Sequence, residues 1–136
     1  MSVEISTSLR RLVTERAGER CEYCLIPQTA SAFPHEPDHI IPLQHGGETD
    51  AENLALACLR CNRHKGPNLG SLDPETGALV PFYNPRVDVW QDHFRLEGAL
   101  IQPLTPQARV TVRILRLNDS PRVEERERLI ALELYP

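Results

Sequence analysis

The fold is decided by two short stretches of sequence, Cys21-Glu22-Tyr23-Cys24 and Cys58-Leu59-Arg60-Cys61. In each stretch a two-residue spacer closes a tight turn, which presents both thiolates to the same side. Two such turns supply four sulfurs, the number that a closed tetrahedral zinc site requires. The pattern therefore predicts a structural zinc ion bound by Cys21, Cys24, Cys58 and Cys61.

Thirty-three residues lie between Cys24 and Cys58, which is more than the usual zinc-ribbon pattern contains. A substantial insert must therefore separate the two zinc knuckles. We expect the chemistry of the protein to reside in that insert.

The length of 136 residues is close to the commonest domain size, so we expect one domain over residues 1–136. The start of the sequence, Met1 to Arg11, contains no apolar run of signal-peptide length, and no stretch is long enough to span a bilayer. These features predict a cytoplasmic protein without a membrane partner. In a reducing compartment, cysteines are better interpreted as metal ligands than as disulfides, which remain the alternative.

The formal net charge of −4 argues against a nucleic-acid partner, because such domains are usually basic. The charge is unevenly distributed, however. Residues 34–52 contain five acidic side chains, whereas residues 58–72 contain Arg60, Arg63 and Lys65 and no acid. Such a basic strip can contact a backbone phosphate even on an acidic protein.

Capping residues and turn signals predict the elements around the knuckles. A first helix should begin at Ser6, Thr7 or Ser8 and end at Gly18. The chain should then be extended over 38–42, turn at 45–47, run through 53–57 into the second knuckle, and form a helix over 59–65 that ends at Gly66-Pro67. The predicted core is strand, turn, strand and helix, with zinc at its ends.

The C-terminal extension, about residues 68–136, has its own pattern of short elements. Asp73 to Gly77 is a turn signal, and residues 93–96 and 99–104 form two short strands. Thr105-Pro106 starts a helix that should stop at Asn118, and Ser120-Pro121 starts a last helix. The fold class is therefore α+β, with a small strand and two-helix extension.

Asp38 and His39 place a carboxylate next to an imidazole. A divalent cation held by the carboxylate could stabilise developing charge while the imidazole takes a proton from water. Histidine suits this task because its ordinary pKa lies close to neutral pH. Taken alone, the dipeptide would be interpreted as a loop histidine beside a surface aspartate. The neighbouring residues favour the catalytic interpretation instead.

Those neighbours are Asp38-His39-Ile40-Ile41-Pro42, His45-Gly46-Gly47, Asn53-Leu54 and Cys58 through Gly66. On these residues the segment of about 18–67 resembles the HNH endonuclease family. The resemblance implies a ββα-metal core stapled by a four-cysteine zinc site. It also implies an enzyme that hydrolyses DNA phosphodiester bonds and leaves 5′-phosphate and 3′-hydroxyl ends.

Carried over by position, the resemblance makes His39 the general base and Asp38 a ligand of a catalytic cation. Asn53 would orient His39 through its side-chain amide. The alternative is that Asn53 caps a helix or turn, and one residue can fill both roles.

The third metal position has two candidates. Many relatives have histidine directly after the second-knuckle cysteine, whereas this chain has Asn62, as in the variant where asparagine completes the metal site. Its oxygen suits Mg²⁺ or Mn²⁺. His64 is the competitor: turned inward it could bind metal or phosphate, and turned outward it joins the basic strip with Arg63 and Lys65. We assign Asn62 to the cation and His64 to the phosphate.

The favoured function is thus a magnesium- or manganese-dependent DNA endonuclease with structural zinc, and RNA remains open as a substrate. The alternative is a noncatalytic zinc-stabilised module that binds nucleic acid or protein, since a scaffold does not guarantee activity. The sequence carries no signal for target sequence, oligomeric state or biological role.

Overall fold

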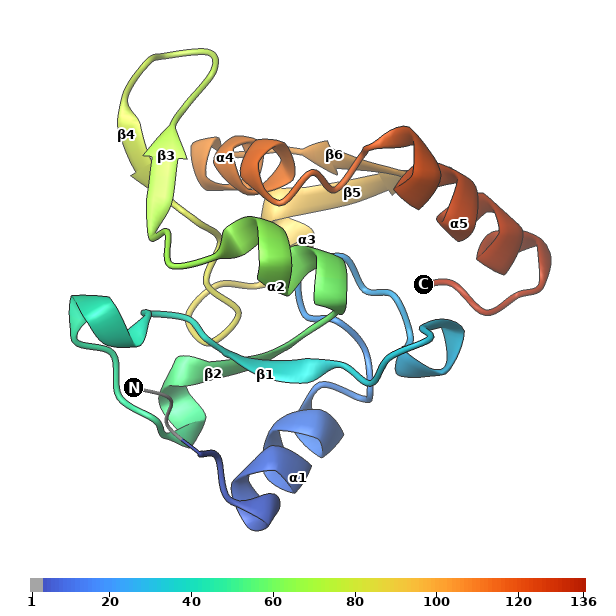
Figure 1. The fold of residues 1–136 in the computed structure, drawn as a ribbon. Coiled ribbons are helices and arrows are strands. Elements are labelled where there is room, and N and C mark those ends of the chain that lie inside the picture. Colours follow the sequence, from blue (N-terminus) through green and yellow to red (C-terminus); the bar gives the residue numbers. More distant parts are fainter. Residues whose placement is uncertain (1–3) are drawn as a thin grey trace.

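The computed structural model describes residues 4–136, and Figure 1 shows its mixed α and β architecture. The predicted domain also includes residues 1–3, which lie outside the described part. The helices and strands follow in the order α1 (Thr7–Arg16), β1 (Glu36–His39), β2 (Leu54–Ala57), α2 (Leu59–Lys65), β3 (Gly70–Leu72), β4 (Leu79–Pro81), α3 (Trp90–His93), β5 (Phe94–Glu97), β6 (Leu100–Pro103), α4 (Pro106–Ile114) and α5 (Ser120–Ala131).

The β1–β2 hairpin lies between two helices, with α1 on one side and α2 on the other (Figure 1). The strands pair antiparallel, with Asp38 opposite Ala55. All four residues of β2 are buried, because side chains that alternate along the strand meet apolar partners on both sides. Leu54 and Leu56 pack with Val13 of α1, while the two alanines of β2 join the core that contains the cysteines.

The predicted strand, turn, strand and helix are confirmed, but β1 lies earlier than the predicted extended segment of residues 38–42. It ends at His39: Ile40 N still donates to the backbone oxygen of Asn53, but the backbone groups of Ile41 bond to the side chain of Asn53 instead of to a strand. Asn53 Oδ1 accepts from Ile41 N and Nδ2 donates to Ile41 O, both at 2.9 Å. The chain then turns through the short 3-10 helix η2 (Leu43–His45).

Helix α2 has the predicted bounds. Cys58 caps its start, because its Sγ accepts a hydrogen bond from Cys61 N at 3.4 Å. Gly66 ends it with a positive φ of 52°, and Pro67 follows. The same turn therefore begins the helix and forms the second knuckle.

In the C-terminal half, the hairpins β3–β4 and β5–β6 pack against α4. Helix α4 ends at Ile114, before the predicted stop at Asn118. Asn118 instead holds β6, since its side chain bonds to both Ile101 N and Ile101 O. The sequence also does not predict α3, whose Trp90 is anchored by a tertiary contact: its Nε1 donates to Tyr23 O at 2.9 Å.

The C-terminal half packs directly on the first knuckle. Besides the Trp90 bond, Tyr135 Oη donates to Cys24 O at 2.6 Å. One cluster of buried side chains extends from Cys21 to Tyr135. On this basis we propose that the two halves form one domain. Within the described residues, no helix has the length and apolar character to cross a membrane.

A buried ion pair joins the β3–β4 turn to α4, and it generates a test of stability. Arg109 donates from Nε and an Nη atom to the two oxygens of Asp73, each at 2.8 Å. These bonds hold the pKa of Asp73 well below its usual range. A carboxyl group whose pKa is lowered by folding stabilises the folded state at pH values above its unfolded-state pKa, and this stabilisation is lost as the pH falls toward the folded-state pKa. Asp73→Asn should therefore lower Tm at pH 7 and make Tm fall less steeply with acid below about pH 4.

Glu97→Gln is the matched control, because Glu97 pairs with Arg95 at the exposed surface. Exposed pairs contribute little to stability, so thermal melts of this variant should follow the wild type. Equal Tm profiles for the two variants would contradict a structural role for the Asp73–Arg109 pair.

Candidate active site and zinc site

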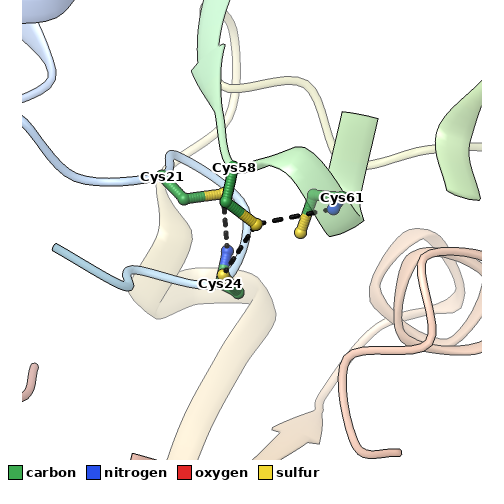
Figure 2. Close-up of side chains that lie close together, drawn as sticks. All are labelled: Cys21, Cys24, Cys58 and Cys61. Carbon is green, nitrogen blue, oxygen red and sulfur yellow. Dashed lines mark hydrogen bonds between the residues drawn. The ribbon is translucent and has the colours of Figure 1, made fainter. Parts of the chain in front are cut away.

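The four cysteines lie together in the structure, as the sequence predicts. Figure 2 shows the four side chains close together. Their sulfur atoms all lie within 4.8 Å of one another, and all four residues are buried. Cys24 Sγ and Cys58 Sγ are 3.7 Å apart. Tetrahedral bonds of 2.3 Å separate sulfurs by about 3.8 Å, so the spacing suits a zinc ion. All four are free thiols rather than disulfides. The cluster therefore fits a structural zinc site.

The turns that carry the sulfurs show why the spacing works. Cys24 N donates to Cys21 Sγ at 3.5 Å, which parallels the Cys61 N bond to Cys58 Sγ in the second knuckle. Burial raises the pKa of the Cys21 and Cys61 thiols. A zinc ion bound here would favour the thiolate form of these two sulfurs, because cysteine binds zinc as the thiolate.

A buried arginine from α5 completes the surroundings of the thiols. An Nη atom of Arg122 donates to Cys61 Sγ at 3.0 Å and approaches Cys58 Sγ at 3.7 Å. Its other Nη atom donates to Leu115 O at 2.6 Å. Four thiolates outweigh one Zn²⁺, so the guanidinium offsets the remaining negative charge. No local motif points to Arg122, because it lies on a helix far along the chain.

A second site forms where β1 faces α2. Asp38 and His39 from β1 and Asn62 from α2 line one open pocket of about 680 Å³. Its other walls come from the turn after β1 and the end of α2, including Pro42, Gln44 and Gly66. Three of the residues singled out from the sequence thus converge on one cavity.

Asp38 is held by an ion pair that the sequence does not predict. Lys65 Nζ lies 3.0 Å from Asp38 Oδ2, and Tyr23 Oη donates to the same oxygen at 3.3 Å. Burial raises the pKa of Asp38, and Lys65 opposes that rise. Within residues 4–136, Oδ1 has no hydrogen-bond partner, so it is the oxygen available to a cation. Placing Lys65 on the basic strip was wrong, because its side chain is only 1 % exposed.

His39 lines the pocket with its ring fixed by a neighbour that the motif does not include. Its Nε2 lies 2.9 Å from Thr49 Oγ1, and Lys65 Nζ donates to the His39 carbonyl at 3.0 Å. In the tautomer with the proton on Nε2, that nitrogen donates to Thr49. Nδ1 is then the nitrogen with a lone pair to accept a proton.

Asn53 does not hydrogen-bond to His39, so the predicted direct orientation of the imidazole is wrong. Its amide instead holds the turn after β1, with bonds to both backbone groups of Ile41 and from Nδ2 to Glu48 O at 2.8 Å. Gly47 belongs to the same arrangement, because a Cβ there would lie 1.7 Å from Ile41 O. This packing positions the turn that leads into Thr49, and through it the ring of His39.

The structure separates the two candidates for the third position. Asn62 lines the pocket with Asp38 and His39, whereas His64 lines a different groove with Arg60 and Arg63. Helical residues advance by about 100°, so positions two apart point to different sides. Burial lowers the pKa of His64, and nearby arginines lower it further. The structure therefore does not bring His64 to the pocket of Asp38 and His39, as its assignment to the scissile phosphate requires, and this helical spacing was the signal that could have shown it.

Comparison with known proteins supports the resemblance stated from the motif. The family model described as HNH endonuclease matches residues 21–68, which span both knuckles and the pocket between them. This segment is therefore confirmed as an HNH-type module, within an α+β fold. No curated protein and no solved structure matches the chain.

The contact of Arg122 with the thiols yields a prediction about zinc. Protein purified without added metal should contain close to one zinc per chain. Arg122→Met should lower zinc affinity by about 10–100-fold, the usual effect of removing a partner of a metal ligand. Zinc transfer to a chromogenic chelator measures this, and Arg122→Lys, which keeps the charge, should lie in between.

Arg126→Met is the matched control. Arg126 is equally buried on α5, but its guanidinium bonds to Ala99 O and Asn118 rather than to sulfur. The Arg126→Met variant should have a lower Tm than the wild type but the same zinc affinity in the chelator assay. If both variants lose the same zinc affinity, the hydrogen bonds from Arg122 to the thiols do not contribute specifically to zinc binding.

Proposed function

We propose that the protein is a metal-dependent endonuclease of the HNH type that hydrolyses phosphodiester bonds in DNA. The observation that carries this proposal is the convergence of Asp38, His39 and Asn62 on one open pocket. Its support is the match of residues 21–68 to the HNH family. The pocket is open enough to admit a backbone phosphate, and it presents a potential base and two potential oxygen ligands.

The oxygen donors of the pocket suit a hard cation. Asp38 Oδ1 and the side-chain oxygen of Asn62 would hold Mg²⁺ or Mn²⁺, which prefer oxygen and keep positions open for water and phosphate. Such a cation would stabilise charge on the phosphate and on the leaving oxygen. Lys65 holds the Asp38 carboxylate in place through Oδ2, so the position of Oδ1, the proposed cation ligand, is fixed as well.

In this proposal His39 is the general base. Nδ1 takes a proton from the attacking water, and the bond from Nε2 to Thr49 holds the ring while its charge changes. The Lys65 bond to the His39 carbonyl fixes the backbone at the same point. Cleavage would leave 5′-phosphate and 3′-hydroxyl ends, as the family resemblance implies.

One observation favours the alternative, a noncatalytic zinc-stabilised module that binds nucleic acid or protein. Asp38 is only 7 % exposed and is already paired with a buried lysine. A carboxylate neutralised in this way binds a second cation less strongly than a solvated one would. A cleavage assay separates the two candidates, because the module would bind without cutting.

Wild-type protein should nick supercoiled plasmid when Mg²⁺ or Mn²⁺ is added. His39→Ala should reduce the rate by ~10²–10⁴-fold, the usual contribution of a general base, with zinc content and Tm unchanged. Asp38→Asn should also lose activity. Asparagine is preferable to alanine at this position because its side chain has the same shape as aspartate and leaves an oxygen beside the ammonium of Lys65. Alanine would leave that buried ammonium without the side-chain oxygen it now contacts. A His39→Ala variant as active as wild type would refute the assigned base.

Asn62→Ala and His64→Ala test the third position. Because Asn62 lines the pocket and His64 does not, only Asn62→Ala should raise the Mn²⁺ concentration needed for half-maximal nicking. Titration of Mn²⁺ at constant DNA measures this for both variants. A raised Mn²⁺ requirement for His64→Ala alone would show that the cation is bound on the other side of α2.

A further inference from the structure

A groove on the side of α2 away from the catalytic pocket collects positive charge. Its volume is about 240 Å³, and it runs between α2 and the start of α5. The lining residues are Arg60, Arg63, His64, Asp119, Pro121 and Arg122. Asp119 is the single acid among them.

Two of these arginines are available to a ligand. Arg60 and Arg63 are exposed, and neither forms a salt bridge to any residue in the described part of the chain. Arg122 differs, since its donors are engaged by thiols and by backbone carbonyls. Its charge is offset by the thiolates it contacts, so Arg60 and Arg63 supply both the free positive charge and the donors of the groove.

Exposed arginines are usually solvated and do not by themselves mark a site. Here they lie on one face of one helix, border a groove, and face few acids on a chain whose net charge is −4. The planar guanidinium presents paired donors that match the oxygens of a phosphate. The ligand chemistry that fits the groove is thus a phosphate group.

We propose that this groove binds a backbone phosphate of the same nucleic acid whose scissile phosphate lies in the catalytic pocket. This inference rests on the proposed function. Asn62 and Arg60 lie on opposite sides of α2, because residues two apart are separated by about 200° around a helix. The two phosphates would therefore lie on either side of α2, about one helix diameter or roughly 10 Å apart.

The test is binding of a fluorescently labelled DNA duplex to the full chain without added Mg²⁺ or Mn²⁺, so that no cleavage occurs. Anisotropy is measured over a range of KCl concentrations. Arg60→Ala/Arg63→Ala should weaken binding and reduce the slope of log K against log salt by about 1, because each neutralised phosphate accounts for about 0.9.

Arg11→Ala/Arg113→Ala is the matched control. It removes the same charge from two exposed arginines on α1 and α4 that form no salt bridge within the described residues, and neither of them lines the groove. The control should keep the wild-type slope. Equal loss of binding in both double variants would overturn the groove as a site, even where the wild type still nicks plasmid.

If the wild type neither nicks plasmid nor binds DNA, the proposed function fails and binding of inorganic phosphate tests the groove by itself. Phosphate added to the wild type should shift the backbone amide signals of residues 60–64 in NMR spectra, and the groove variant should show no such shifts. Shifts in the wild type alone would keep the groove as a phosphate site with another ligand. Absence of shifts in the wild type would reject it.

Discussion

The four-cysteine cluster is the constraint on which the remaining structure depends. It joins the two ends of a thirty-three-residue insert, whose own secondary structure is limited to short elements. The second knuckle also begins α2, since Cys58 caps that helix, and so the cluster sets where α2 lies against β1. Arg122 and Tyr135 attach the C-terminal half to the same cluster. Disruption of this cluster would thus affect both halves.

The ion pair between Asp38 and Lys65 connects the cluster to the candidate active site. A buried pair costs desolvation energy and is weak evidence for stability, but removing one partner is expensive. Its effect here is geometric. Lys65 contacts the Asp38 carboxylate and the His39 carbonyl, so α2 holds β1 at the point where the pocket opens. Asp38 and His39, the proposed cation ligand and base, are therefore positioned by the helix that the second knuckle begins.

Helix α2 has different chemistry on its two sides. One side carries Asn62 and Lys65 toward β1, and the other carries Arg60, Arg63 and His64 toward α5. The basic strip of the sequence is thus divided: its lysine is structural, and its arginines face a groove. The C-terminal extension provides the other wall of that groove, so under our proposal it contributes to phosphate binding as well as to packing.

The sequence by itself determined the features that depend on neighbouring residues. Spacing of cysteine pairs, caps and glycine stops predicted the zinc cluster, the ββα core and the bounds of α2, because turns and helix ends are set locally. Family resemblance also predicted catalytic or cation-binding roles for Asp38, His39 and Asn62, which the structure brings to one pocket. Tertiary structure alone decided the roles of Thr49, Lys65 and Arg122, and it moved Asn53 from the imidazole to the backbone of Ile41. These roles arise from contacts between side chains and distant parts of the chain, and no local pattern records which partner a buried polar group will find.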